Sequence, residues 1–220
     1  SMRFFAAADC HPQTIDVLKT RAEPMEIELV VGNVAEQQQT PDEALFGALI
    51  QNPGTFGDIH DIEDLITKWH ELGTLVSVAS DPMSLVLIKP PGESGADVVI
   101  GSTQRFGVPM GFGGPHAAYF AAREKNMRSV PGRIIGVSID RRGKTALRMA
   151  LQTREQHIRR EKATSNICTA QALLAIISAS YAIYHGPIRL KNIANKIHYN
   201  TRFLKKSLEF LNFEVISNNY

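Results

Sequence analysis

The feature that most constrains the fold is an alternation of short apolar runs with helix-like segments through the first half of the chain. Such alternation is typical of parallel strands joined by helices that pack against the sheet. The runs that predict strands span residues 4–8, 27–31, 45–50, 75–79, 98–100 and 117–121. Residues 15–22 predict a helix, residues 37–40 a polar loop and residues 52–54 (Asn-Pro-Gly) a turn. We therefore expect an α/β fold with a mostly parallel sheet and flanking helices.

Residues 62–72 carry the clearest helical pattern. Their apolar side chains recur at three- and four-residue spacings, which places them on one face of an amphipathic helix. These side chains are Ile62, Leu65, Ile66, Trp69 and Leu72. Gly73 follows directly, and a glycine just past the last helical residue is a common way for a helix to end.

The pattern changes after residue 130. Residues 134–139 and 145–151 are apolar runs on either side of a basic turn, Arg-Arg-Gly-Lys, at 141–144. This arrangement predicts a hairpin or an extended arm. From residue 167 onward the chain is predicted to be mainly helical, with a break at His-Gly-Pro, residues 185–187.

We divide the chain into two parts at this break. Residues 1–185 are expected to form a large α/β domain that is incomplete at its amino end. Residues 186–220 are expected to form a connector helix and the start of a truncated small domain. Residues 1–2 resemble a cloning remnant, and residues 213–216 predict a strand with no partner after it. We therefore expect a piece of a longer protein.

Composition excludes several classes of function. Hydrophobic residues make up 44% of the chain and charged residues 21%, as in ordinary soluble globular proteins. The net charge of +2 gives no indication of nucleic-acid binding, and no apolar run reaches the length of a membrane span. The two cysteines, Cys10 and Cys168, make no Cys-x-x-Cys motif and favour a reducing compartment. No His/Cys cluster has metal-ligand spacing.

Polar residues follow several predicted strands, where parallel sheets bind ligands. They are Asp9, Cys10, His11, Asn52, Ser80, Asp81, Ser102, Thr103 and Gln104. Two of them also have a purely structural interpretation. Asp81 precedes Pro82 and is a candidate cap for a short helix that begins at Met83. His11 precedes Pro12 at a helix start, where it would only order the turn.

Residues 101–116 form a loop with five glycines in sixteen residues, directly after a predicted buried strand. Glycine lets the backbone approach a ligand or a partner closely, and the two prolines of the loop stiffen it. The loop fits neither G-x-G-x-x-G nor G-x-x-x-x-G-K-[ST], the phosphate-binding patterns. A tight structural crossover is the alternative interpretation.

Residues 151–169 carry many charges of both signs. The structural interpretation is a solvated helix with pairs such as Glu155 and Arg159, followed by a helix cap at residues 164–166. No aromatic residue lies among the basic ones, which argues against single-stranded nucleic acid. The chain also contains no G-x-S-x-G nucleophile elbow.

Four segments together closely resemble the glycine decarboxylase family, the P-proteins of the glycine cleavage system. They are residues 7–14 (AADCHPQT), 89–93 (KPPGE), 106–116 and 150–174. The resemblance implies the aspartate-aminotransferase type of pyridoxal-phosphate (PLP) fold, fold type I, with residues 1–185 as its large domain. It also implies decarboxylation of glycine on PLP and transfer of the aminomethyl group to the lipoyl group of the H-protein.

Members of this family carry the Schiff-base lysine in their carboxyl-terminal half or in a separate subunit, and this chain resembles the other half. The resemblance assigns Asp81 to the pyridine nitrogen of PLP. It assigns the lysine position to Gln104, which lies 104 − 81 = 23 residues later. An amide cannot form an imine, and Arg105 is no substitute nucleophile. Lys89 and Lys125 lie in other loops.

The resemblance thus implies no catalytic residue and no covalently bound PLP in this chain, with Asp81, Gln104 and His11 as positional candidates for cofactor contacts. It implies that the chain supports the active site of the lysine-bearing half, with residues 108–116 and 154–162 as candidate contacts. The expected location is the bacterial cytoplasm, or the mitochondrial matrix in a eukaryote. Partners would be that half and the H-protein, with no nucleic acid, membrane or metal.

Two other functions stay open at this point. The first is a different PLP enzyme, such as a relative of cysteine desulfurases or hydroxymethyltransferases, with Lys125 or Lys162 recruited as nucleophile. The second is a non-catalytic module that binds PLP or glycine non-covalently through Asp81 and His11.

Overall fold

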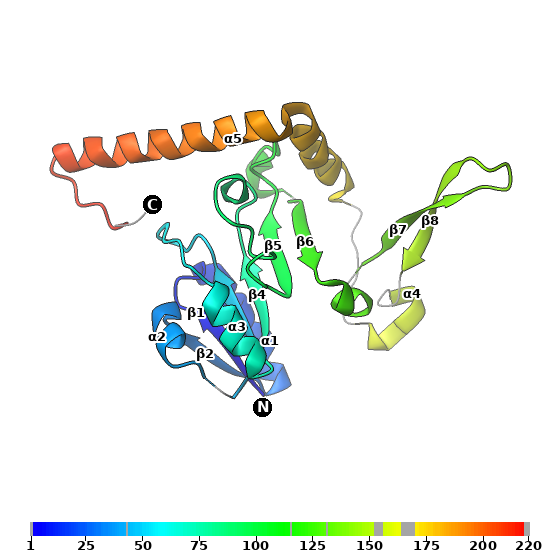
Figure 1. Ribbon diagram of the computed structural model, residues 1–220, viewed down its shortest axis with the longest axis horizontal. Helices are drawn as coiled ribbons and strands as arrows, with labels where there is room; N and C mark the ends of the chain where they lie inside the picture. Colours follow the sequence, from blue (N-terminus) through cyan, green and yellow to red (C-terminus); the bar gives the residue numbers. More distant parts are fainter. Residues whose placement is uncertain are drawn as a thin grey trace. The chain divides into compact units, whose positions relative to one another are not determined.

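The computed structural model describes residues 2–42, 44–114, 116–130, 132–151, 156–163 and 170–217, without the side chains of residues 156 and 157. The chain divides into two compact units. The first comprises residues 1–121 and 172–220, and the second residues 122–171. Each unit is described by itself below (Figure 1).

A six-stranded sheet in the order β2-β1-β3-β4-β5-β6 is the centre of the first unit (Figure 1). Its strands are β1 (Arg3–Ala7), β2 (Glu28–Gly32), β3 (Leu45–Gln51), β4 (Leu75–Ala79), β5 (Val98–Ser102) and β6 (Ala118–Ala122). The pairings from β2 through β5 are parallel. Each predicted strand of this sheet is confirmed to within two residues, and so is the parallel α/β architecture.

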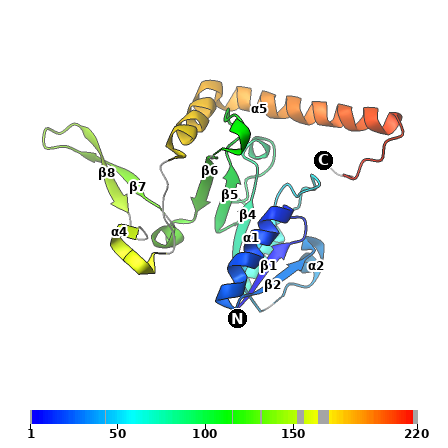
Figure 2. The same ribbon diagram turned by 180° about the vertical axis from the view of Figure 1, so that it is seen from behind.

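Helices cover both faces of the sheet. α1 (Pro12–Ala22) lies on the face seen in Figure 2, and α3 (Glu63–Glu71) on the face seen in Figure 1. Right-handed crossovers require this, because β1 connects to β2 in one direction across the sheet and β3 to β4 in the other. Glu63 and Asp64 in the first turn of α3, and Lys68 and His70 in its last, complement the helix dipole.

The predicted polar loop at residues 37–40 is wrong, because the chain forms helix α2 (Val34–Gln39) there. The side chain of Asn33 accepts a hydrogen bond of 2.8 Å from the backbone N–H of Ala35 and thereby caps the helix. Glutamine has a good helix propensity. A local cap and these propensities outweigh the polar character of the segment.

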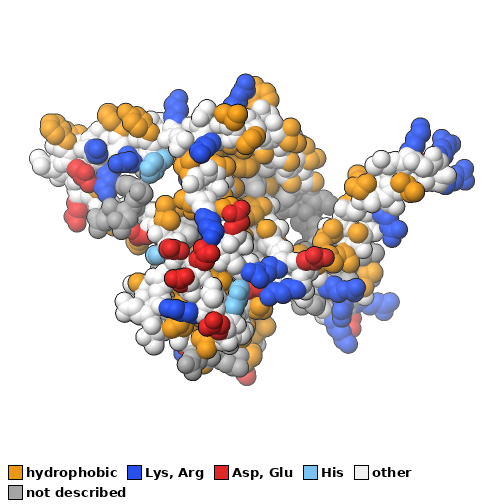
Figure 3. All heavy atoms as spheres, viewed as in Figure 1, with side chains coloured by type: hydrophobic (Ala, Val, Ile, Leu, Met, Phe, Trp, Pro, Cys, Tyr) orange, Lys and Arg blue, Asp and Glu red, His pale blue; other side chains and the backbone are white. Residues whose placement is uncertain are grey.

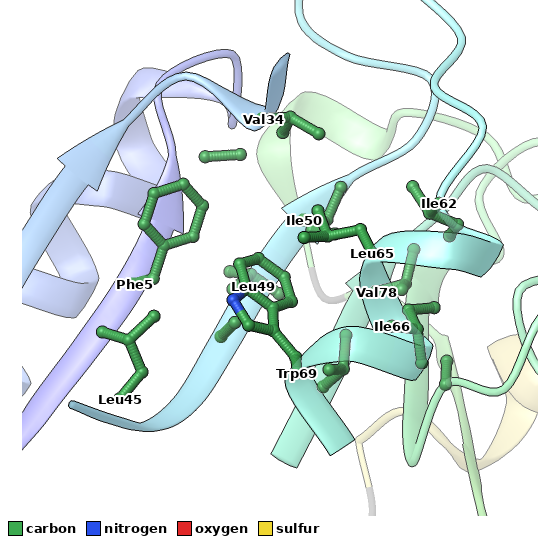
Figure 4. Close-up of a cluster of buried hydrophobic side chains, with 14 of the residues drawn as sticks. Phe5, Val34, Leu45, Leu49, Ile50, Ile62, Leu65, Ile66, Trp69 and Val78 are labelled. Carbon is green, nitrogen blue, oxygen red and sulfur yellow. The ribbon is translucent and has the colours of Figure 1, made fainter. Parts of the chain in front are cut away.

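The hydrophobic core lies between the sheet and α3. Trp69 and Leu65 of α3 are fully buried, as are Phe5 of β1 and Ile50 of β3. Figure 4 shows the Trp69 ring extending from α3 toward Phe5 and Leu49. The Phe5 and Trp69 ring centroids are 5.5 Å apart in a tilted arrangement. Ile62, Leu65, Ile66 and Trp69 of the predicted stripe are buried and pack on the central strands, whereas its last member, Leu72, is exposed.

The second unit contains the predicted hairpin. Strands β7 (Ile134–Ile139) and β8 (Thr145–Leu151) pair antiparallel. The Asp140 carboxylate shapes the turn by accepting backbone hydrogen bonds from Arg142 (2.7 Å) and Lys144 (2.9 Å). Lys and Arg side chains gather at this tip in Figure 3. The described part of this unit also includes the short helices η4 (Glu124–Ser129), α4 (Gln156–Arg159) and η5 (Arg160–Lys162).

The long helix α5 (Ala172–Phe210) belongs to the first unit. It is kinked at Gly186, whose φ is 62° and ψ 176°, and Pro187 follows, so the predicted break is confirmed. Leu190 and Ala194 beyond the kink pack against Met83. The domain boundary proposed at this break stays a prediction. No helix in the described ranges is long and apolar enough to cross a membrane.

The predicted strand at residues 213–216 is wrong, because these residues are irregular in the structure. A strand needs a neighbour to take up its backbone hydrogen bonds. The Lys205 side chain instead donates a 2.8 Å hydrogen bond to the carbonyl of Ser217.

Candidate functional site

A pocket of about 650 Å³ opens at the carboxyl ends of the parallel strands. Residues from the start of α1 and from the ends of β3, β4, β5 and β6 line it. They are His11, Thr14, Gln51, Ala79, Ser80, Asp81, Ile100, Gly101, Ser102, Gln104, Arg105, Ala118, Tyr119 and Phe120. All three positional candidates, His11, Asp81 and Gln104, therefore meet in one pocket.

The Asp81 carboxylate is engaged at both oxygens. Oδ1 accepts a 2.9 Å hydrogen bond from the backbone N–H of Met83. The short helix η2 (Ser84–Val86) begins one residue later than predicted and has Met83 at its N-cap position, so Asp81 orders the turn before the helix. Oδ2 lies 2.6 Å from Nε of Arg105, in an ion pair with a side chain that the sequence did not mark as a site residue. Asp81 thus orders the turn before η2 and also forms part of the pocket wall.

Gln104 lines the pocket at the position that the resemblance assigns to the lysine. Its backbone N–H lies 3.2 Å from the Ser102 hydroxyl oxygen, and its carbonyl accepts a 3.2 Å bond from Val108. None of the described residues that line the pocket is a lysine. Lys89, the lysine nearest in sequence to Asp81, instead forms an ion pair of 2.5 Å with Glu63.

His11 occupies the position before the first residue of α1 but makes no side-chain cap bond. Its ring Nδ1 lies 3.1 Å from the Thr55 hydroxyl, which ties the start of α1 to the loop after β3. His11 thus orders the turn through a contact with the loop after β3 and not through a bond to the helix itself. His11 is also one of the residues that line the pocket.

Tyr119 on β6 closes the floor of the pocket and was not found from the sequence. Its hydroxyl donates a 2.9 Å hydrogen bond to the carbonyl of Ser80. Burial, with a smaller contribution from the Asp81 charge, raises the pKa of Tyr119 to about 12. The phenol therefore stays protonated and keeps donating at neutral pH. Tyr119 could have been proposed from the sequence, because it lies in the strand predicted at residues 117–121, next in the chain after the strand that leads into the pocket.

Four other strand-end residues do not line the pocket and instead make contacts within the fold: Asp9, Cys10, Asn52 and Thr103. The carboxylate of Asp9 accepts a 2.6 Å hydrogen bond from His60 Nε2, and the side chain of Asn52 bonds to both backbone groups of His60. The bond to Asp9 raises the pKa of His60 above its ordinary value, although burial opposes the rise. His60 lies in a loop after the turn, so no strand-end pattern pointed to it.

Cys10 and Thr103 are buried. Burial, and secondarily the Asp9 charge, raises the pKa of Cys10 to about 11, so the thiol stays protonated and is a poor nucleophile. The Thr103 hydroxyl lies 3.0 Å from the hydroxyl of Ser178 on α5. That contact fixes the start of the loop that carries Gln104.

The glycine-rich loop has a packed part and an exposed part. Phe106 stacks on Tyr181 of α5 with ring centroids 5.6 Å apart, and Gly107 has a left-handed backbone beside the same ring. This part of the loop thus packs against α5. Farther on, Phe112 is fully exposed with φ 56°. The structure does not describe Pro115.

The charged segment is described only in part. Residues 158–162, in α4 and η5, are exposed. The predicted pair of Glu155 and Arg159 and the predicted cap at residues 164–166 lie outside the described residues. Lys125 and Lys162 belong to the second unit. Among the described residues, no group of His, Cys, Asp or Glu is suited to hold a metal ion.

Comparisons with known proteins agree with one another. The chain matches the family model "Glycine cleavage system P-protein" over residues 1–220. Curated relatives from Nostoc punctiforme and Photobacterium profundum, both named "Glycine dehydrogenase (decarboxylating)", are 58% identical over 217 residues and 57% identical over 220 residues. These alignments cover 99% and 100% of this chain but only 22% and 23% of the relatives. The chain thus spans less than a quarter of their length.

A solved structure shows the same fold. It is a crystal structure of glycine decarboxylase (P-protein) of the glycine cleavage system in inhibitor-bound form. The TM-score is 0.79 at 34% sequence identity, and the match covers 90% of this chain and 48% of that one.

Proposed function

Because the chain belongs to the glycine cleavage system P-protein family, we propose that it is a segment of a glycine dehydrogenase (decarboxylating). The whole enzyme would decarboxylate glycine with PLP and pass the aminomethyl group to the lipoyl group of the H-protein. Relatives of that name at 57–58% identity support this proposal. The fold likeness to a P-protein supports it independently of the identity.

The pocket of this chain does not fit covalently bound PLP. Such enzymes hold the cofactor by an imine to a lysine and by an acidic partner at the pyridine nitrogen. Among the described residues that line the pocket there is a carboxylate, Asp81, but no lysine. Gln104 offers an amide, which has no nucleophilic nitrogen. Gln104 in place of a lysine is the observation that supports our proposal that the chain assists an active site and does not form one itself.

The supporting role needs a contact with the lysine-bearing half, and we assign it to residues 108–116 and 154–162. Met110 and Phe112 are large apolar side chains that lie exposed in the first of these segments. Gly111 and Gly113 beside them have open space where a Cβ would sit, so packing within this chain does not account for the shape of the loop. Exposed apolar side chains on a shaped loop are typical of protein interfaces.

The test is chemical labelling of the chain as it stands. PLP is added to the purified protein, the absorbance is recorded, borohydride is added, and labelled peptides are identified by mass spectrometry. We expect only the diffuse labelling of surface lysines that an unfolded sample also shows. Stoichiometric attachment of reduced PLP to a single lysine, such as Lys125 or Lys162, would contradict the proposal. Calorimetry with PLP in the same buffer separates non-covalent binding from no binding.

A further inference from the structure

We propose that Arg105 determines what this pocket excludes. Arg105 forms an ion pair with the Asp81 carboxylate, which is the group that a PLP ring nitrogen would need as its partner. This ion pair would disfavour PLP binding even if a lysine were present in the pocket. The inference rests on the proposed function, because it concerns the same pocket, but it assigns the exclusion of PLP to a second residue.

The contact geometry carries the first step. Arg105 Nε lies 2.6 Å from Asp81 Oδ2, a short distance typical of charge-assisted hydrogen bonds. The other oxygen, Oδ1, is bound to the N–H of Met83 at 2.9 Å. A pyridinium N–H that approached this carboxylate would compete with a donor at either oxygen. Each oxygen of Asp81 therefore already accepts a hydrogen bond, and the charged one comes from Arg105.

Charge carries the second step. A PLP ring nitrogen is useful as an electron sink when it is protonated, and a carboxylate partner favours that protonated form. The Arg105 guanidinium is permanently charged. A cation in contact with the same carboxylate neutralises it and repels a pyridinium. Arg105 thus opposes binding of the cofactor for as long as it stays paired with Asp81.

The backbone at Arg105 is held in place by its neighbours. Phe106 and Thr103 close a turn around it through a 2.8 Å backbone hydrogen bond, and Phe106 stacks on Tyr181 of α5. Asp81 and Arg105 both line a second pocket of about 250 Å³, between η2 (Ser84–Val86) and α5. The ion pair therefore forms a wall common to two pockets, and its loss would enlarge the first.

The experiment restores the lysine with and without the arginine. The variants are Gln104→Lys, the double variant Gln104→Lys/Arg105→Ala, and a control, Gln104→Lys/Lys89→Ala. The control removes an ion pair of the same kind, Lys89 to Glu63, outside the pocket. Each purified chain is titrated with PLP, the visible band of a protein imine is recorded, and borohydride-reduced peptides are mapped.

We expect the Arg105→Ala double variant to form a reducible imine at residue 104 at PLP concentrations at least about tenfold lower than the other two variants. Equal titrations of the single and double variants would overturn the inference, and so would the absence of an imine in all three. Circular dichroism checks folding, and Arg105→Gln replaces Arg105→Ala if the latter is unfolded. Labelling of a native lysine in the unmodified chain would instead contradict the proposed function, so the two failures are distinguishable.

Discussion

Gly101 lies where the sheet and the pocket meet, at a position with no space for a side chain. An ideal Cβ on Gly101 would lie 2.0 Å from the carbonyl oxygen of Ser80 and 2.5 Å from Cε1 of Tyr119. The same carbonyl accepts the Tyr119 hydroxyl, so the missing Cβ lets β4, β5 and β6 come together below Asp81. The absence of a side chain at Gly101 therefore helps to position Ser80, Asp81 and Tyr119, which all line the pocket.

We expect Gly101→Ala to lower the free energy of unfolding by about 2–3 kcal/mol, because the backbone of β4 must move to admit the methyl group. Gly92→Ala is the matched control, since nothing lies within 4 Å of the Cβ position at Gly92. It should change stability by less than about 1 kcal/mol. Urea denaturation followed by circular dichroism measures both. If both substitutions changed the free energy of unfolding equally, the expected clash between the new methyl group at residue 101 and the Ser80 carbonyl would be contradicted.

The Asp9–His60 pair gives this fold a pH-dependent contribution to stability. The pKa of His60 is raised above its ordinary value of 6.5 in the folded chain. Protonation of the His60 imidazole is therefore more favourable in the folded chain than in the unfolded chain, so the protonated form stabilises the fold. The contribution is complete below the unfolded pKa and is lost as the pH rises through the folded pKa.

A double-mutant cycle with Asp9→Asn and His60→Gln isolates this contribution. We expect a coupling free energy of about 1 kcal/mol at pH ~5.5, falling to a small value at pH ~9. Thermal or urea unfolding of the four proteins at both pH values measures it. A coupling that is the same at both pH values, or larger at the higher one, would contradict the assignment.

At the scale of elements, the sequence predicts the parts whose hydrophobic pattern repeats over several residues. β3 is buried along nearly its whole length and reads as a continuous apolar run, as a central parallel strand does. α3 shows its buried stripe directly. The pattern fails where structure depends on a single contact, as in the Asn33 cap of α2, or on pairing with another segment, as at residues 213–216.

The same distinction explains how much of the pocket could be predicted. His11, Asp81 and Gln104 were found because topology alone brings strand ends to one edge of a parallel sheet. Which strand-end residues face the pocket depends on side-chain direction, and sequence position does not give it: Asp9 turns to His60 instead. The role of Arg105 depends on a contact across 24 positions, 105 − 81, which no local pattern encodes.

At the scale of the whole molecule, the chain keeps the scaffold of a cofactor site but presents different groups in it. The strand ends, a carboxylate and the shaped loop are present, while an amide and an ion pair line the pocket at the positions that the resemblance assigns to the PLP contacts. The chain spans 22% of its relative from Nostoc punctiforme. Under the proposed function, the contribution of this chain is contact with the rest of the enzyme.

Those contacts lead to a prediction at the tip of the glycine-rich loop. Phe112 is fully exposed and has a left-handed backbone, an unfavourable conformation for a bulky residue that is not packed against its own chain. We expect Phe112→Asp to weaken association with a separately expressed lysine-bearing half by at least about tenfold, as the loss of an aromatic anchor does at interfaces. Isothermal titration calorimetry or sedimentation measures the association.

The control for Phe112→Asp places the same charge at an exposed apolar position on another element. Val17 on α1 is 58% exposed, and Val17→Asp should leave association unchanged. Because neither side chain is in the core, both variants should unfold within about 0.5 kcal/mol of the unmodified chain. Unchanged association of Phe112→Asp would remove residues 108–116 from the interface and leave residues 154–162 as its remaining candidate. Equal weakening by both variants would point instead to a general effect of added negative charge.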